Sequence, residues 1–208
     1  MFTRRVIVGV SGASGAAYAI RALEALKALE DVETHLVLTS AARQTIALET
    51  DRSARDVEAL ASVVHPINQI AASIASGSFR THGMIVIPCS MRTLSAIAYS
   101  VSENLLLRAA DVVLKDRGRL VLVARETPLH LGHLRAMVQV TEMGAVVMPP
   151  MPAFYHRPVS VDDIVNQTVN RALDLLDLEL PHDLFKRWAG SECQTPPTPT
   201  EVLPQESS

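Results

Sequence analysis

The stretch at residues 8–23, VGVSGASGAAYAIRAL, decides the fold and raises the first question about the ligand. An apolar run leads into a turn of small residues, and a pattern with one apolar and one polar helical face follows. This order predicts a strand, a tight loop and a helix, the opening unit of an α/β fold. Gly9, Gly12 and Gly15 are spaced three apart, but Val10 stands where the dinucleotide fingerprint G-x-G-x-x-G needs a glycine. The loop is therefore not predicted to hold the two phosphates of a dinucleotide.

Apolar runs and amphipathic stretches alternate along most of the chain. The runs predict strands at 5–10, 34–40, 83–90, 119–125 and 144–152, and the amphipathic stretches predict helices at 15–29, 41–49, 53–60, 93–101, 104–116, 132–143 and 161–176. Because the strands are apolar throughout, we expect an α/β fold with a parallel sheet covered on both faces. Residues 1–189 are expected to form a single domain. Residues 190–208 are rich in Pro, Thr and Ser and predict a tail without a core.

The totals exclude several classes of function. The chain has 208 residues and a net charge of -3 without a Lys/Arg block, so electrostatics offer no case for nucleic acid or an anionic membrane. No apolar run reaches the roughly 18–20 residues of a membrane span. The start shows no signal-peptide pattern, and Cys89 and Cys193 make no disulfide framework, so we expect a cytoplasmic protein. The hydrophobic content of 48% predicts apolar surface buried between subunits, and hence a homo-oligomer.

Polar residues stand at the ends of four predicted strands. After the loop at 11–15 come Thr39 and Ser40, then PCSMRT at 88–93, then ARETP at 124–128 with Arg125. Ligands of open parallel sheets bind beyond the carboxyl ends of the strands. An NAD site would favour an acidic residue after the second strand, whereas this end offers hydroxyls. Hydroxyls, helix-start N–H groups and an Arg suit a phosphate monoester, which predicts a mononucleotide or another phosphorylated ligand.

Simpler explanations stay open for each of these features. A small-residue turn also serves tight packing, and Ser90 with Thr93 can cap a helix without binding an anion. Cys89 is better explained as a buried small residue than as a nucleophile, because no motif places a base beside it. His130 and His133 form an i,i+3 pair, but no further ligand supports a metal site, and none is expected.

Taken together, several segments resemble the UbiX flavin prenyltransferases, a group that includes proteins described as phenylacrylic acid decarboxylase subunits. The resemblance covers about residues 5–188. It implies a flavodoxin-like Rossmann fold, a three-layer sandwich with a mostly parallel sheet, assembled as a homododecamer with active sites at subunit junctions. The segments are VGVSGASGA, ETHLVLTSAARQT, LET, SGSFRTHGMIVIPCSMRTLSAIA, RAADVVLKDRGRLVLVARETPLHLGHLRAM, GAVVMPPMPAFYHRP and VNRALDLL.

The resemblance also implies a reaction. Members of this family join dimethylallyl monophosphate to N5 and C6 of reduced FMN, release phosphate without a metal, and supply the prenylated FMN to UbiD-type decarboxylases. The family often has Ser-Lys where this chain has Thr39 and Ser40, so a hydroxyl is kept and a charge is lost. By motif, the flavin site is expected at Gly12, Ala13, Ser14, Thr39, Ser90, Met91, Arg92, Thr93 and Arg125.

The same carry-over assigns the prenyl-donor site. Tyr155, Arg171 and Lys115 would bind dimethylallyl phosphate, and Trp188 would help to close the pocket. Glu49 and Arg108 would reach the site from neighbouring subunits. The catalytic residues are expected to be Glu126, Ser14 and Lys115, with Glu126 moving the C6 proton and Ser14 assisting it.

Structural explanations that involve no ligand also remain open for the individual donor-site residues. Arg171 lies at the edge of an apolar helical stripe and can make a salt bridge across a subunit interface. Tyr155 can be an interface aromatic, and Glu126 can cap the helix that follows it.

Two rival functions remain at this point. One is an FMN-dependent decarboxylase of the phosphopantothenoylcysteine type, which uses a catalytic His and a Pro-x-Met-Asn segment. The comparable segment here, PPMPAFY, has no Asn. The other is a non-catalytic flavin-carrying decarboxylase subunit, which is free to lose Lys115, Glu126, Tyr155 and Arg171. All four are present.

Overall fold

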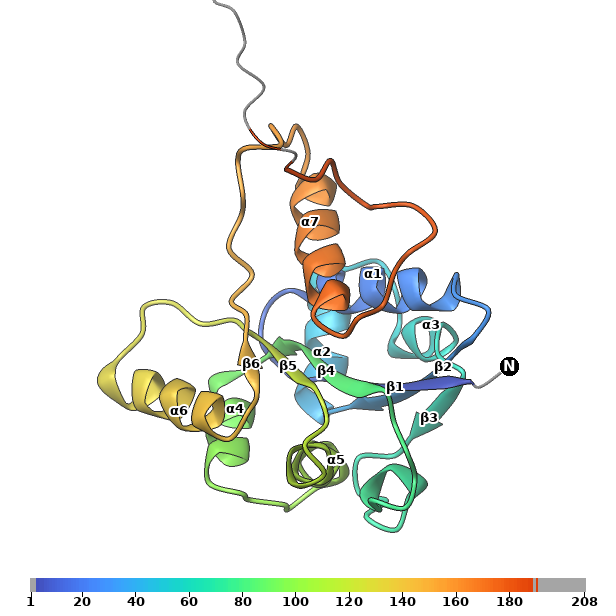
Figure 1. The fold of residues 1–208 in the computed structure, drawn as a ribbon, viewed down its shortest axis with the longest axis vertical. Coiled ribbons are helices and arrows are strands. Elements are labelled where there is room, and N and C mark those ends of the chain that lie inside the picture. Colours follow the sequence, from blue (N-terminus) through green and yellow to red (C-terminus); the bar gives the residue numbers. More distant parts are fainter. Residues whose placement is uncertain (1–2, 189, 191–208) are drawn as a thin grey trace, which may run out of the picture.

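The computed structural model describes residues 3–188 and 190, and it contains a six-stranded parallel sheet in the order β3-β2-β1-β4-β5-β6 (Figure 1). The tail was predicted at 190–208, and its residues 191–208, including Cys193, lie outside the described residues. The strands are β1 (Arg4–Val10), β2 (Val32–Leu38), β3 (Val63–His65), β4 (Gly83–Cys89), β5 (Leu120–Ala124) and β6 (Val146–Val147). The helices are α1 (Ala16–Lys27), α2 (Ser40–Glu49), α3 (Ala54–Glu58), α4 (Met91–Ala98), α5 (Leu105–Lys115), α6 (Leu131–Glu142) and α7 (Val161–Asp174), with a 3₁₀ helix η1 (Ser73–Ala75).

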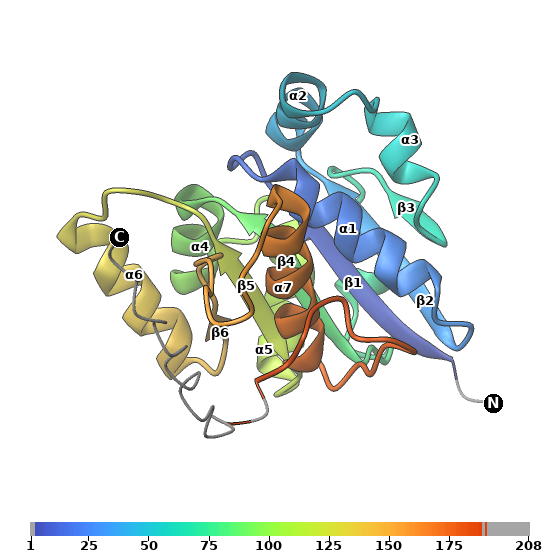
Figure 2. The ribbon, with the colours of Figure 1, turned by 90° about the horizontal axis from the view of Figure 1, so that it is seen from above.

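Helices cover both faces of this sheet, which confirms the expected α/β three-layer fold. Alternate residues of β1 enter different cores: Val6 and Val8 pack beneath α1 and α7, whereas Ile7 packs against α4, α5 and α6. Figure 1 shows α1 and α7 on one side of the sheet and α5 on the other, and Figure 2 shows α1 and α7 lying side by side across it. β4 and β5 are buried throughout, and β1 and β2 are buried over their last five residues, which explains why these strands are mostly apolar.

The sheet differs from the prediction at its two edges. β3 was not predicted, because its three residues are too short to make a pattern. β6 was predicted as part of a longer strand but pairs over only Val146–Val147. Pro149 and Pro150 follow at once, and a proline has no N–H to donate to a sheet.

The strand order creates a switch point between β1 and β4. The chain moves from β1 outward to β3 and then returns to β4 and moves outward on the other side, so the loops after β1 and β4 diverge. Buried Ser11 ties these two loops together: its Oγ donates to the carbonyl of Pro88 at 3.0 Å and accepts from the backbone N–H of Ser90 at 2.7 Å. The crevice beside this staple is where the predicted ligand residues converge.

Candidate functional site

A pocket of about 590 Å³ lies at the carboxyl ends of the strands, and we call it the strand-end pocket. It combines the loop after β1, the start of α2 and the turn after β4, so three of the four predicted strand ends meet in one place. Of the predicted flavin residues, its lining includes Gly12, Thr39, Ser90, Arg92 and Thr93. Its other lining residues are Ser11, Ser40, Ala41, Ile67, Asn68, Ala96, Glu103, Asn104 and Leu107.

Two of the helices that begin at this pocket have a hydroxyl residue as their cap. Thr39 caps α2 and accepts from the N–H of Ala42 at 3.0 Å. Ser90 caps α4, accepting from the N–H of Thr93 at 3.3 Å and donating to its Oγ1 at 3.1 Å. The partial positive charge of both helix starts faces the pocket. A residue that caps one of these helices can therefore also lie at a site that binds an anion.

A third helix start, that of α1, already holds a carboxylate. Gly15 has a φ of 115°, which favours glycine, and its N–H and that of Ala16 donate to Glu49 Oε2 at 2.8 and 2.9 Å. Burial alone would raise the pKa of Glu49, but hydrogen bonds from Ser14, Ala16 and Gly15 and the charge of Arg125 lower it. The loop is thus built to stabilise a negative charge.

The resemblance implies that Glu49 reaches the site of a neighbouring subunit, and that expectation stays a prediction. Within its own chain, α2 carries Glu49 to the loop at 12–15. The physical reason is that α2 leaves the sheet beside α1, so its last residue comes down on the first turn of α1.

The fourth strand end, after β5, contributes Arg125 and Glu126. The N–H of Arg125 donates to the carbonyl of Cys89 at 2.9 Å, which joins this end to the turn after β4. Glu126 is exposed, and its Oε1 accepts from the N–H of Thr127 at 3.0 Å. It does not cap the following helix, because α6 begins at Leu131 with His130 as its cap. Among the described contacts, Oε2 of Glu126 accepts no hydrogen bond.

Two of the predicted flavin residues offer only their main chain. The side chain of Met91 is buried in the core beneath α4, and Ala13 is buried in the loop. Backbone N–H groups at these positions suit an anion, whereas their side chains add no polar group.

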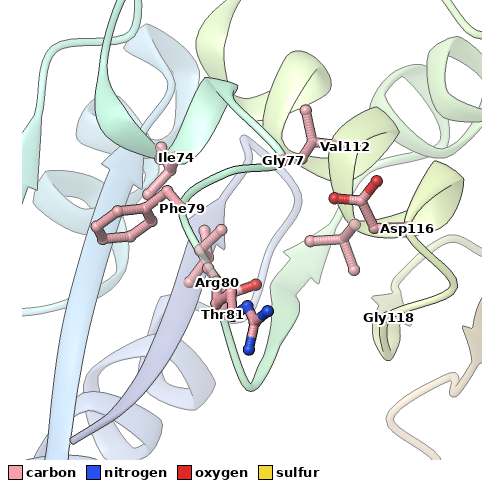
Figure 3. A pocket seen from close by; sticks show the side chains of 10 residues that line it. Ile74, Gly77, Phe79, Arg80, Thr81, Val112, Asp116 and Gly118 are labelled. Carbon is pink, nitrogen blue, oxygen red and sulfur yellow. The ribbon is translucent and has the colours of Figure 1, made fainter.

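Lys115 does not join the strand-end pocket within one chain. It is the last residue of α5, and its Nζ pairs with Asp116 Oδ1 at 2.8 Å. A second cavity of about 320 Å³ lies beside it, lined by Ile74, Phe79, Arg80, Thr81, Val112 and Asp116 among others (Figure 3). Thr81 and Gly118 of this cavity precede β4 and β5, so Lys115 stands at the amino ends of the strands, the opposite edge of the sheet.

Arg108 also faces away from the strand-end pocket. Its Nη1 donates to Asp111 at 2.7 Å and its Nε to the carbonyl of Ala75 at 3.3 Å, so the side chain lies over η1. This position agrees with the expectation that Arg108 serves a different subunit, although that expectation stays a prediction.

Tyr155, Arg171 and Trp188 form a separate group near the C-terminal end of the described chain. The rings of Tyr155 and Trp188 meet edge to face at 5.7 Å, and Arg171 pairs with Asp174 one turn further along α7 at 2.8 Å. Figure 1 shows the segment between β6 and α7 rising away from the sheet. Within residues 3–188, no hydrogen bond or ion pair joins this group to the loop at 12–15.

Cys89 and the histidine pair His130 and His133 lie outside the strand-end pocket. Cys89 is fully buried, and burial raises the pKa of its thiol, which makes it a poor nucleophile. The rings of His130 and His133 lie 3.6 Å apart. In the described part of the chain, no group of three or more His, Cys, Asp or Glu is arranged to hold a metal ion, and no helix there is long and apolar enough to cross a membrane.

Sequence reasoning missed several residues of the strand-end pocket. Ile67 and Asn68 follow the unpredicted strand β3, so recognising that strand would have placed them at the same edge. Glu103 was missed as well, and it pairs with Arg92 at 3.4 Å at the rim. Ser11 lies next to the predicted Gly12, but no sequence signal marks it as the staple between two loops.

Comparison with known proteins finds relatives over most of the chain. The family described as Flavoprotein matches residues 2–173. The flavin prenyltransferase UbiX of Escherichia coli (strain K12) is 62% identical over 188 residues, which are 90% of this chain and 100% of the relative.

Two solved structures are similar in both sequence and fold. One is AnUbiX (PadA1) in complex with FMN and dimethylallyl pyrophosphate, with 53% identity, a TM-score of 0.87 and coverage of 91% of this chain and 100% of that chain. The other is the dodecameric FMN-dependent UbiX-like decarboxylase from Escherichia coli O157:H7, with 52% identity, a TM-score of 0.87 and coverage of 89% and 100%. The resemblance carried by the motifs is therefore confirmed, and this chain belongs to the UbiX flavin prenyltransferase family.

Proposed function

We propose that this protein transfers the dimethylallyl group of dimethylallyl monophosphate to N5 and C6 of reduced FMN, releasing phosphate and forming prenylated FMN. The observation that carries the proposal is the strand-end pocket, where two capped helix starts and Arg92 meet at the switch point of the sheet. The names of the relatives support it, since one is a flavin prenyltransferase at 62% identity and another binds FMN with a dimethylallyl ester. The product would serve a UbiD-type decarboxylase in the cytoplasm.

The acceptor FMN fits the residues of the strand-end pocket. Gly12 lies so close to α2 that an added Cβ would meet Ala41 Cβ at 2.3 Å, so the loop follows the helix without a side chain between them. We assign the phosphate of FMN to the donors of Thr39, Ser90 and Thr93 and to backbone N–H groups of the loop. Arg125 would add a positive charge at the neighbouring strand end.

The prenyl donor requires cationic groups, because breaking its allylic C–O bond leaves charge on the departing phosphate. We assign this task to Arg171, Lys115 and Tyr155, with Trp188 closing the site. Lys115 and Arg108 lie on α5, away from the strand-end pocket of their own chain. We therefore propose that a complete site draws residues from neighbouring copies in a homo-oligomer, and that this oligomer is a dodecamer like the relative from Escherichia coli O157:H7.

Bond formation at C6 requires loss of a ring proton, and Glu126 is our candidate for accepting it, assisted by Ser14. Glu126 is exposed beside Arg125 at the end of β5 and does not cap α6. A carboxylate in this position can accept the proton, whereas its amide analogue cannot.

The experiment that tests the proposal mixes the purified oligomer with reduced FMN and dimethylallyl monophosphate under anaerobic conditions. We expect mass spectrometry to find a flavin one isoprenyl unit heavier, together with free phosphate. Parallel reactions with the pyrophosphate donor, and with added EDTA, address donor choice and metal use. Unchanged FMN after binding of both substrates has been verified would overturn the proposal.

The substitution Glu126→Gln separates the two bond-forming steps. We expect it to bind both substrates and form the N5 bond, and then to close the ring about 10²–10⁴-fold more slowly, the usual contribution of a general acid or base. Arg171→Ala should instead lose donor binding and therefore both bonds. Flavin spectra and masses followed over time distinguish the two variants. Ring closure at the wild-type rate in Glu126→Gln would show that Glu126 has no part in proton transfer.

A further inference from the structure

Asp174 is the centre of a charge network that none of the site assignments uses. Its two carboxylate oxygens accept a forked pair of hydrogen bonds from Arg187, Nη1 to Oδ2 and Nη2 to Oδ1, both at 2.8 Å. Arg171 Nη1 also donates to Asp174 Oδ2 at 2.8 Å. The guanidinium of Arg187 is bound on its other edge by Asp183, whose Oδ2 accepts from Nε at 2.7 Å. One carboxylate thus links a proposed donor-binding residue to the segment that follows α7.

A buried amide anchors this network to the body of the protein. Asn170 is 1% exposed, its Nδ2 donates to Asp174 Oδ1 at 3.2 Å, and its Oδ1 accepts from the N–H of Leu184 at 2.7 Å. The segment at 181–188 is therefore joined to α7 twice, by a main-chain hydrogen bond at Leu184 and by the guanidinium of Arg187. We call the four residues Asn170, Asp174, Asp183 and Arg187 the C-terminal latch.

The latch lies beside the two aromatic residues of the proposed donor site. Trp188 directly follows Arg187 and meets Tyr155 edge to face. The ring centroid of His156 lies 5.6 Å from that of Tyr155 and 5.8 Å from that of Phe185. The segment at 185–188 is therefore packed against the segment between β6 and α7, which carries Tyr155. Fixing Arg187 therefore fixes the partner of Tyr155.

The latch differs from an ordinary surface ion pair. An isolated exposed pair stabilises little, because water screens it and two flexible side chains lose freedom. Here Asp174 is 19% exposed and receives four hydrogen bonds, two of them in the planar fork geometry that guanidinium and carboxylate share. Burial alone would raise the pKa of Asp174, but the hydrogen bonds and charges of Arg187 and Arg171 lower it, so the carboxylate stays ionised at neutral pH.

The sharing of Asp174 also leaves Arg171 available to an anion. Both carboxylate oxygens are engaged by Arg187, and in the described part of the chain Arg171 gives Asp174 a single hydrogen bond, from Nη1. Its Nε and Nη2 can then meet a phosphate. Without Arg187, Asp174 would be free to take the fork of Arg171 for itself and turn it away from a ligand.

We propose that Asp174 and Arg187 are positioning residues of the prenyl-donor site, which hold Trp188 against Tyr155 and orient Arg171 toward the donor phosphate. This inference rests on the proposed function, because it assumes that Tyr155, Arg171 and Trp188 bind the donor. Neither Asp174 nor Arg187 is expected to touch the substrates.

The test uses the full-length oligomer and the fact that Trp188 is the single tryptophan of the chain. The variant is Arg187→Gln, with Arg187→Lys as the conservative form that keeps the charge without the fork. The matched control is Arg119→Gln, which breaks an exposed Arg–Asp pair with Asp177. Asp177 lies beside the latch but is not one of its residues, so the control removes a neighbouring charge pair and leaves the fork of Arg187 in place. Tryptophan emission and acrylamide quenching report the latch itself, and steady-state kinetics report the donor and FMN separately.

Trp188 is 62% exposed within one chain, so its emission and quenching report mainly the contact with Tyr155. In Arg187→Gln we expect both to change, and we expect a KM for the donor raised roughly tenfold, the size of one lost charge-assisted hydrogen bond. The KM for FMN should not change, Arg187→Lys should lie between the wild type and Arg187→Gln, and Arg119→Gln should match the wild type. Unchanged tryptophan emission, or a freed tryptophan with an unchanged donor KM, would overturn the proposal. Failure of the proposed function shows itself differently, as a wild-type protein that forms no prenylated flavin.

Discussion

Gly12→Ala tests whether the loop after β1 and the start of α2 are held in contact as the structure shows. Gly12 does not have a positive φ, so an alanine there is not opposed by its backbone conformation. The obstacle is steric, because the new Cβ would meet Ala41 Cβ at 2.3 Å and the backbone C and Cα of Ala41 at 3.2 and 3.3 Å. Apolar carbons normally approach to about 3.5–4.0 Å, so the loop or the helix must move by roughly 1 Å.

Neither side can move without losing contacts. The loop is held by Ser11, which is bonded to both Pro88 and Ser90, and α2 is held by its cap Thr39. Overpacking of this kind costs about 1–3 kcal/mol, which for a chain of this length lowers Tm by roughly 2–12 °C. Because Gly12 lines the strand-end pocket, FMN binding should weaken as well.

Ala41→Gly provides the rescue, because it removes the atom that an alanine at position 12 would strike. Alone it should cost up to about 1 kcal/mol through lower helix propensity, but the double variant should recover most of the loss caused by Gly12→Ala. Gly9→Ala serves as the comparison, since its Cβ would meet side-chain atoms of Leu106 and Met84 at 3.1–3.3 Å and no backbone atom, so it should cost less than Gly12→Ala. The assay is thermal unfolding of all variants at one protein concentration, with bound flavin measured in parallel. Additive losses of Tm in the double variant would refute the reasoning.

Two further predictions concern pH. Burial alone would raise the pKa of Glu49, but the hydrogen bonds at the start of α1 lower it below its usual 4.5. The stability that Glu49 contributes is therefore present above pH 4.5 and is lost as the pH falls through its folded-state pKa. Glu49→Gln should flatten the acid limb of a curve of Tm against pH, and a curve parallel to that of the wild type would contradict this. Burial and then the nearby His35 lower the pKa of His65 below its usual 6.5, so its contribution is present above pH 6.5 and is lost on acidification. His65 bonds His35 at 3.0 Å, and His35 bonds Glu33 at 2.8 Å, so His65→Gln keeps a polar partner while removing the titration; its Tm should fall less than that of the wild type between pH 7 and 5, and an equal fall would exclude His65 as the source.

The strands that carry a long sequence pattern were predictable. A short edge strand that forms only because it pairs with its neighbour was not. β1, β2, β4 and β5 are mostly apolar stretches of five to seven residues, each with at least five consecutive buried residues, and each was predicted. β3 exists because three residues next to β2 complete its edge, a tertiary effect without a local signal. That miss also hid Ile67 and Asn68, since a residue is assigned to the carboxyl edge only when its strand is known.

The strand-end pocket was predictable because topology and chemistry agree there. Carboxyl ends of parallel strands meet at one edge, so hydroxyls after β2 and β4 had to converge, and Thr39 and Ser90 do so in one pocket. Sequence motifs alone carry no geometry that shows how many chains contribute residues to one site. They imply that Glu49 reaches a site from a neighbouring subunit, which stays a prediction, and the structure adds that Glu49 also contacts the loop of its own chain.

Topology fixes the edge of the sheet at which Lys115 lies. A helix that leads into a parallel strand must end at the amino edge of the sheet, and α5 leads into β5. Leu107, near the start of α5, lines the strand-end pocket, and Lys115 lies eight residues later, about 12 Å along the helix axis at 1.5 Å per residue. A lysine side chain is shorter than this distance and is already paired with Asp116 at 2.8 Å. Lys115 therefore does not reach the strand-end pocket of its own chain. Its part in the proposed donor site, supplied by a second copy of the chain, stays a prediction.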